Sequence, residues 1–94
     1  MSAERSYIIL DERDNVATAI LDLQAGQKIG TEGKEITLTQ AIPYGHKFAL
    51  QNIRKGDYVI KYGAQIGRAT AAISRGDHVH VHNVEDIVDE VRKK

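Results

Sequence analysis

The residues best suited to chemistry stand together in "GDHVHVHN", from Gly76 to Asn83. Three of the chain's four histidines, His78, His80 and His82, alternate with valines in this stretch. Histidine titrates near neutral pH and also ligates metals, so it can serve as an acid, a base or a ligand. The spacing is compatible with a metal site, a catalytic site, or a strand that carries histidine on its solvent face.

Strand geometry determines which of these side chains can act together. Successive residues of a strand point to opposite faces, so Val79 and Val81 are expected in the core and the histidines on the open face. Histidines two residues apart lie roughly 6.5–7 Å apart along a strand, and two such imidazoles can converge on one ion. Because His78 and His82 are too far apart in a straight strand to share an ion, His78 is expected to be only a surface residue.

A complete metal site needs a further ligand, and His46 in "IPYGHK" is the only other histidine of the chain. Pro43 and Gly45 mark a turn at this point, which we expect to bring His46 near His80 and His82. Spacing alone leaves the alternative open, in which the histidines are solvent-facing residues without a function. By the same reasoning the neighbouring lysine, Lys47, is a candidate site residue or an ordinary surface lysine.

Length and composition limit the classes of function. The 94 residues suffice for one domain, spanning 1–94, with a modest core. Thirteen basic residues balance thirteen acidic ones, so neither nucleic acid nor a membrane is an expected partner. The absence of cysteine excludes disulfides, thiolate catalysis and cysteine-ligated metals. The apolar run from Tyr7 to Leu10 is too short for a signal peptide, and no transmembrane stretch follows, so the chain is expected to be soluble and cytoplasmic.

Positive charge is concentrated in the middle of the chain. Between residues 44 and 68 there is one acidic residue, Asp57, against five basic ones: Lys47, Arg54, Lys55, Lys61 and Arg68. This stretch could face an anionic ligand, and the alternative is a solvated surface.

One short pattern recurs three times and predicts the architecture. It consists of an apolar residue, two others, a glycine, two others and a second apolar residue, in "LQAGQKI", "IRKGDYV" and "ISRGDHV". Each glycine is expected to adopt a positive φ, to turn the chain and to be followed by a strand. The segments "KEITLTQAI", "YVIKYG" and "QIGRATAAI" also have the composition of strands, with Gly67 as a bulge or a close backbone approach.

Two helices are predicted beside the strands. The first covers "DNVATAILDL", with Asp14 or Asn15 as its N-cap and Gly26 after its end. The second covers "NVEDIVDEVRKK", capped by Asn83, with its apolar residues on one face: Val84, Ile87, Val88 and Val91. The predicted fold is therefore mainly β, with one short N-terminal helix and a C-terminal helix.

Several motifs in one order resemble a known family. "DNVATAILDLQAG", "IPYGHKFAL", "GDYVIKYGAQIGRA" and "GDHVHVHN" are similar to the N-terminal domain of the altronate and galactarate dehydratases. The same domain forms the small subunit of the sulfolactate sulfo-lyases. The resemblance runs from about Asp14 to Asn83 and implies a SAF-type β-clip fold, which suits the glycine turns.

The resemblance implies a β-elimination of water or sulfite from an anionic hydroxy acid. The family uses a divalent metal, iron or manganese, shared with or held by a large catalytic subunit. That large region is absent here, so the chain is expected to be a small subunit or an excised domain. Its start and its predicted final helix favour a separate subunit, with homo-oligomerisation left open, and we expect no turnover from the chain alone.

The resemblance also assigns candidate residues. Catalytic roles fall on His46, Lys47 and His80, and metal binding falls on His46, His80 and His82. Substrate binding falls on Asn15, Lys47, Tyr62, Gly63 and Asn83. Elimination beside a carboxylate needs a base, stabilisation of the developing negative charge, and an acid or metal at the leaving group. Histidine and lysine can supply these groups.

Two other classes of function compete with this interpretation. SAF domains also occur as carbohydrate-binding or ice-binding modules, and related domains serve as periplasmic assembly chaperones. The lack of a signal sequence argues against a chaperone, and the "GHK" and "HVHN" motifs favour the enzyme subunit over a binding module.

Overall fold

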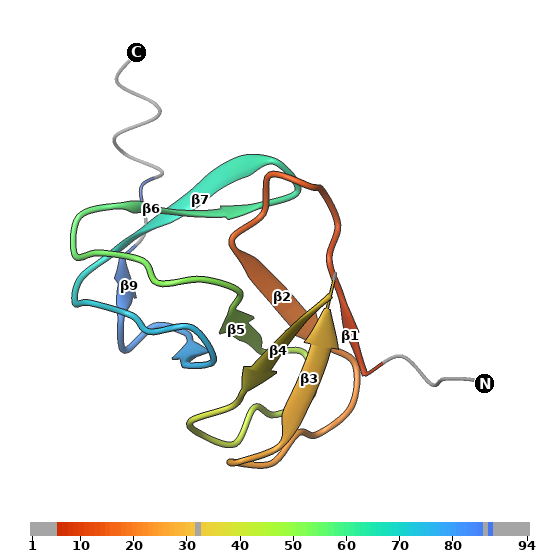
Figure 1. The fold of residues 1–94 in the computed structure, drawn as a ribbon. Coiled ribbons are helices and arrows are strands. Elements are labelled where there is room, and N and C mark those ends of the chain that lie inside the picture. The colour runs from red at the N-terminus through yellow and green to blue at the C-terminus, as the bar shows by residue number, and fades with distance from the viewer. Residues whose placement is uncertain (1–5, 32, 86, 88–94) are drawn as a thin grey trace.

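The computed structural model describes residues 6–31, 33–85 and 87, and within these residues the chain forms strands and turns without a helix (Figure 1). The strands are β1 (Tyr7–Ile8), β2 (Val16–Ala19), β3 (Lys28–Thr31), β4 (Lys34–Thr37), β5 (Lys47–Ala49), β6 (Tyr58–Lys61), β7 (Ala64–Ala69), β8 (His78–Val79) and β9 (Val84–Glu85). The mainly β prediction is confirmed. This part of the chain also contains no helix with the length and apolar character of a membrane span.

Three antiparallel sheets make up the described fold. The central sheet has four strands in the order β1-β2-β5-β8, flanked by the β3–β4 hairpin and by a three-stranded sheet, β6-β7-β9. In Figure 1, β2 and β5 lie between the β3–β4 hairpin and the β6–β7 hairpin.

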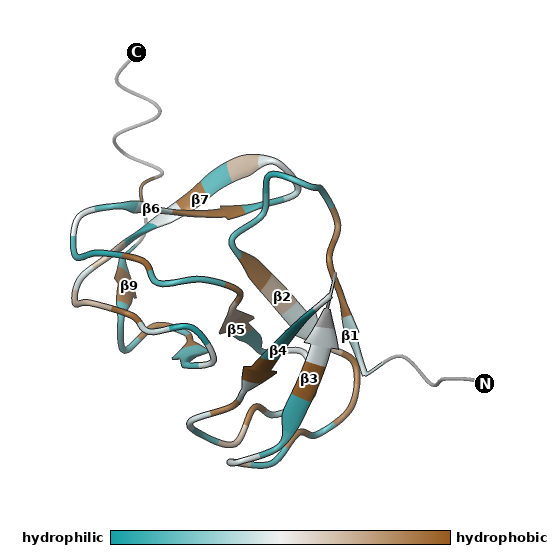
Figure 2. Cartoon of the chain, viewed as in Figure 1, coloured by the Kyte–Doolittle hydropathy of each residue, from teal (hydrophilic) through white to brown (hydrophobic). Residues whose placement is uncertain are grey.

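The central sheet is buried on both faces, and each face has its own core. Ala17 of β2 and Phe48 of β5 belong to a cluster with the hairpin residues Ile29 and Ile36. Their sequence neighbours belong to a second cluster under β6 and β7, formed by Val16, Ala49, Ile53, Val59, Ala69, Ile73 and Val79. Figure 2 shows the result as hydrophobic colour along β2 and a single hydrophobic band on β3.

The predicted N-terminal helix over "DNVATAILDL" is wrong, because Val16–Ala19 is strand β2. A strand covered on both faces is apolar at consecutive positions and loses the alternation that identifies a half-buried strand. Three of the four β2 residues are buried, so this run had no strand-like period. Asn15 does not cap a helix, because its side-chain amide is hydrogen-bonded to β6.

The predicted C-terminal helix is contradicted where it begins. Val84–Glu85 forms strand β9, which pairs with β7. Val84 packs against the second core cluster and Ile87 is buried, so two members of the predicted apolar face do lie inside. The remainder of this prediction, residues 86 and 88–94, lies outside the described residues.

The glycine-turn prediction is confirmed. Gly26, Gly56 and Gly76 have φ values of 84°, 92° and 93°, and β3, β6 and β8 begin two residues after them. All six flanking apolar residues are buried: Leu23, Ile29, Ile53, Val59, Ile73 and Val79. A fourth segment, "IPYGHKF", fits the same pattern and was not among the three predicted copies. It turns at Gly45, where φ is 86°, and buries Ile42 and Phe48.

The four turns form two matched pairs. Leu23 of the first turn bridges to Ile42 of the second, as Ile53 of the third bridges to Ile73 of the fourth. The glycines are offset by 30 residues (56 − 26) and 31 residues (76 − 45). The described fold thus contains the same hairpin unit twice, and each copy covers one face of the central sheet, which explains the two core clusters.

Gly67 is a site of close backbone approach, as predicted. A Cβ at this position would meet the side chain of Val84 and would lie 2.9 Å from the carbonyl oxygen of Glu85. The β6–β7 register also shifts between Val59 and Ile60, so a bulge accompanies the glycine. The missing side chain lets β9 pair with β7.

Candidate functional site

Strand register gathers three histidines at one edge of the central sheet. β5 pairs with β8 so that Phe48 lies opposite His78. Continued past the strand ends, this register sets His46 opposite His80, because 48 + 78 and 46 + 80 both equal 126. Residues that face each other across an antiparallel pair share a side, as do residues two apart on one strand. His46, His78 and His80 therefore project from the same face.

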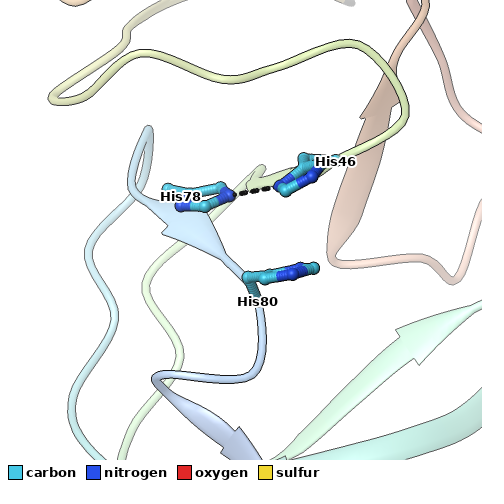
Figure 3. Close-up of side chains that lie close together, drawn as sticks. All are labelled: His46, His78 and His80. Atoms are coloured by element: carbon cyan, nitrogen blue, oxygen red, sulfur yellow. Dashed lines mark hydrogen bonds between the residues drawn. The ribbon is translucent and has the colours of Figure 1, made fainter.

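The three imidazoles lie against one another (Figure 3). His46 Nδ1 is 2.9 Å from His78 Nε2, and the rings of His46 and His80 stack with centroids 4.2 Å apart. One ring nitrogen from each residue lies within 4.8 Å of the corresponding nitrogens of the other two. Among the described residues this is the group whose donor atoms could hold a metal ion.

The environment keeps two of these histidines uncharged. Burial, followed by the neighbouring His46, lowers the pKa of His78 below its ordinary value of 6.5. The same causes in the same order lower the pKa of His80. A neutral imidazole has a free lone pair, which is the form that ligates a metal or accepts a proton. His78 and His80 are therefore available for either role at neutral pH.

A tight turn after His80 replaces the straight strand that the alternation predicted. Val79 is fully buried as predicted, but Val81 is 81% exposed, so its predicted place in the core is wrong. The side chain of Asn83 causes the turn: its oxygen accepts a hydrogen bond from the His80 amide at 3.0 Å, and its NH2 group donates to the His78 carbonyl at 2.8 Å. Asn83 holds the backbone that carries two of the clustered histidines.

The positions of His78 and His82 differ from those expected from the sequence. His78, expected to be only a surface residue, is a member of the cluster. His82 lies in the exposed turn, with its ring tilted by 31° and 5.2 Å from that of His78. The turn after His80 directs His82 away from the strand axis. The alternation of histidine and valine in the sequence does not predict this turn.

The side chain of Lys47 projects from the face of β5 opposite to that of His46, but it lines a hollow that His80 also lines. It is paired with Thr18 on one side and Val79 on the other. Together with His80 it lines a hollow of about 360 Å³ whose other walls are Ile66, Val81, Val84 and Glu85. Burial, and then the charge of Lys61, lowers the pKa of the Lys47 ammonium. Within the described part of the chain this ammonium forms no ion pair.

The remaining predicted residues lie outside the histidine cluster. Asn15 is buried, and its amide donates to the Tyr58 carbonyl and accepts from the Ile60 amide at 3.0 and 2.8 Å. Tyr62 and Gly63 form the two-residue turn between β6 and β7, with φ values of 60° and 69°. Both values are positive, as a type I′ hairpin requires. Their predicted substrate contacts stay predictions.

The turn between β6 and β7 is tied to the rest of the fold and carries a second lysine. The Gly63 amide donates to the carboxylate of Asp14 at 2.8 Å, which fixes the hairpin tip. The Lys61 ammonium lies over the ring of the exposed Tyr62, 5.1 Å from its centroid. Because Lys61 also acts on the pKa of Lys47, positive charge from β5 and β6 meets in this region.

The fold and site define a small β-domain with paired glycine turns, an edge cluster of imidazoles and a half-buried cation. Its sequence matches the family described as the altronate/galactarate dehydratase SAF domain over residues 5–87. The chain therefore belongs to this family, and the SAF part of the fold prediction is confirmed.

Named relatives fall into two groups. The chain is 49% identical over 77 residues to the altronate dehydratase of Escherichia coli (strain K12), and 39% identical over 88 residues to that of Bacillus subtilis (strain 168). These matches cover 82% and 94% of this chain but only 16% and 18% of the relatives. The chain thus spans less than a fifth of the length of these dehydratases.

The second group is similar in length to this chain. The (2R)-sulfolactate sulfo-lyase subunit alpha of Chromohalobacter salexigens is 34% identical over 86 residues, which cover 84% of this chain and 92% of that relative. By its name, that relative is one subunit of a larger enzyme.

Proposed function

We propose that this chain is the SAF component of a metal-dependent hydro-lyase that acts by β-elimination on a sugar acid such as altronate or galactarate. It would act as a small subunit or an N-terminal domain beside a large catalytic region. The family membership and the two altronate dehydratases among the relatives support this proposal.

The observation that carries the proposal is the environment of the Lys47 ammonium. Its ammonium is half-buried, forms no ion pair with any described residue and lines the same hollow as His80. A buried cation without a counter-ion is unfavourable, and a substrate carboxylate would relieve this. A carboxylate held there would place the carbon chain of a hydroxy acid beside the imidazole of His80, where a neutral histidine can accept a proton.

The histidine cluster supports the divalent metal that the sequence resemblance implies. Two nitrogens bound at right angles to an ion, each at roughly 2.1 Å, are roughly 3 Å apart, and His46 Nδ1 and His78 Nε2 are 2.9 Å apart. Iron or manganese, held here or by the large region, would act as a Lewis acid on the departing hydroxyl. Of the three predicted ligands, His46 and His80 belong to the observed cluster and His82 does not.

A sulfo-lyase subunit is the second candidate function. The coverage of 92% of the sulfolactate sulfo-lyase subunit alpha favours it, since that relative has no further large region in the same chain. Both candidates remove a leaving group next to an acidic carbon and need the same carboxylate anchor. A carbohydrate-binding module without catalysis is the third candidate.

Reconstitution tests the proposal. The chain is combined with a large dehydratase or sulfo-lyase polypeptide from the same organism, and turnover of altronate, galactarate and sulfolactate is measured with iron or manganese. We expect no turnover by either chain alone and turnover of one hydroxy acid by the pair. Turnover by the chain alone, or a pair inactive on all three acids, would contradict the proposal.

Lysine variants connect the activity to the site. Lys47→Met should lower kcat/KM roughly 10- to 100-fold, because a hydrogen bond to a charged group is lost. Lys28→Met is the matched control, since Lys28 is an exposed lysine on β3. If the two variants behave alike, Lys47 is a surface lysine.

A further inference from the structure

The histidine cluster has the properties of a metal site that this chain can complete with its own residues. Its three donors come from two segments, the turn before β5 and the end of β8, which the sheet register holds together. Neither segment needs another polypeptide to meet the other, because both belong to the hydrogen-bonded central sheet.

We propose that His46, His78 and His80 form a three-nitrogen site for a borderline transition-metal dication such as Zn²⁺, Fe²⁺ or Co²⁺, with His78 as the third ligand. This inference deepens the proposed function by assigning the ligands and the class of metal. Its test needs no turnover, so the two can fail separately.

Geometry selects His78 as the third ligand. Its Nε2 is 2.9 Å from His46 Nδ1, and a single ion can bridge nitrogens at this separation. The rings of His46, His78 and His80 are nearly parallel, with interplanar angles of 14–22° and centroids 4.2–5.5 Å apart. One ring nitrogen of each residue lies within 4.8 Å of those of the other two, so side-chain rotations could direct all three at one ion. The ring of His82 is tilted by 31° against that of His78, and His82 does not belong to the group whose donor atoms lie within 4.8 Å of one another.

The donor set selects the metal. Imidazole nitrogen suits zinc, iron, copper and nickel, whereas Mg²⁺, Ca²⁺ and Mn²⁺ prefer oxygen ligands. Since the cluster contributes three nitrogens, iron is favoured over manganese. Three protein ligands also leave coordination positions open, which is typical of catalytic rather than structural sites.

The nearby charges do not prevent binding. The charge of Lys47 acts on His78 and His80, but its side chain leaves β5 on the opposite face. Glu85, which lines the hollow beside His80, adds a carboxylate to the same region. Without an ion, His46 Nδ1 and His78 Nε2 lie 2.9 Å apart, so one of these nitrogens can donate to the other. A bound ion would replace that shared proton, because each nitrogen must then offer its lone pair.

The full chain, without any partner, provides the test. Zn²⁺ is titrated into the protein while the imidazole ring protons are followed by NMR, with Mg²⁺ as the comparison ion. With four histidines in the chain, each ring can be assigned. We expect saturable shifts of His46, His78 and His80 at one equivalent of zinc, with little change at His82 and none with Mg²⁺.

Two variants separate the ligands. His78→Gln should weaken zinc binding on the order of a hundredfold, since each ligand carries roughly a quarter of the binding free energy of four-ligand zinc sites. His82→Gln, the matched control from the same turn, should bind like the unmodified chain. Because the NMR titration uses the unmodified chain, a His78→Gln variant that fails to fold leaves the inference testable.

Three outcomes would overturn the inference. They are the absence of zinc binding, equal losses in the His78 and His82 variants, and binding of Mg²⁺ as tight as that of zinc. None of these outcomes touches the elimination activity of the assembled enzyme, because the large region could hold the metal.

Discussion

Asn83→Ala is expected to destabilise the chain, although sequence resemblance places this residue at the substrate. The side chain is 9% exposed and makes two hydrogen bonds, with the amide of His80 and the carbonyl of His78. Alanine removes both and leaves two partly buried backbone groups without their partner. At roughly 1 kcal/mol or more for each group, the free energy of unfolding should fall by about 2–3 kcal/mol. That is a large share of the roughly 5–14 kcal/mol typical of a domain of this length.

Urea unfolding followed by circular dichroism measures the effect. With a slope of roughly 1–2 kcal/mol per molar, the midpoint should fall by about 1–3 M. Asn52→Ala is the control: Asn52 is exposed, and its oxygen accepts one hydrogen bond, from the Arg75 amide at 2.9 Å. Its loss should be under about 1 kcal/mol. If Asn83→Ala unfolds at the same urea concentration as the unmodified chain but abolishes turnover, the residue binds substrate and the structural reasoning is refuted.

Two further predictions concern turns and protonation. Gly76→Ala should destabilise more than Gly26→Ala in urea unfolding. Both glycines have a positive φ, which disfavours alanine by roughly 1–2 kcal/mol, but only at Gly76 would the new Cβ press on a backbone oxygen, that of Thr37. The contribution of His78 and His80 to the free energy of unfolding should be constant above about pH 6.5 and should fall as the pH drops from there to their lowered pKa values. The unfolded chain binds these protons more readily, so protonation favours unfolding.

Each of these predictions has a clear contrary result. Equal destabilisation by alanine at Gly26 and Gly76 would show that a Cβ at Gly76 does not clash with the carbonyl oxygen of Thr37. A pH profile that does not change when both His78 and His80 are replaced by glutamine would show that other groups titrate in this range.

The turns of this protein could be predicted from its sequence because they depend on local chemistry. A positive φ excludes most residues other than glycine, so the glycine pattern marks the chain reversals regardless of tertiary contacts. Two apolar residues at fixed distances from each glycine then become buried. Applied once more, the same rule finds the turn at Gly45, and the offsets of 30 and 31 residues between matched turns were already present in the sequence.

Hydrophobic periodicity predicts the wrong element where a strand is buried on both faces. Val16 to Ala19 is apolar at consecutive positions because one core lies on each face of the central sheet. A pattern of this kind does not distinguish a doubly buried strand from a helix. Val84 was expected in a helix because it shares a helical spacing with Ile87, Val88 and Val91. Instead, Val84 and Glu85 pair with β7.

The sequence by itself determined the inventory of the site: four histidines, Lys47 beside one of them, no cysteine, and a chain reversal before His46. Tertiary structure decided which of these residues meet. The β5–β8 register sets His46 opposite His80, and the side chain of Asn83 bends the chain so that Val81 and His82 leave the strand. Strand alternation is a rule about an isolated, straight strand, whereas pairing and side-chain hydrogen bonds between distant segments determine where the strand ends.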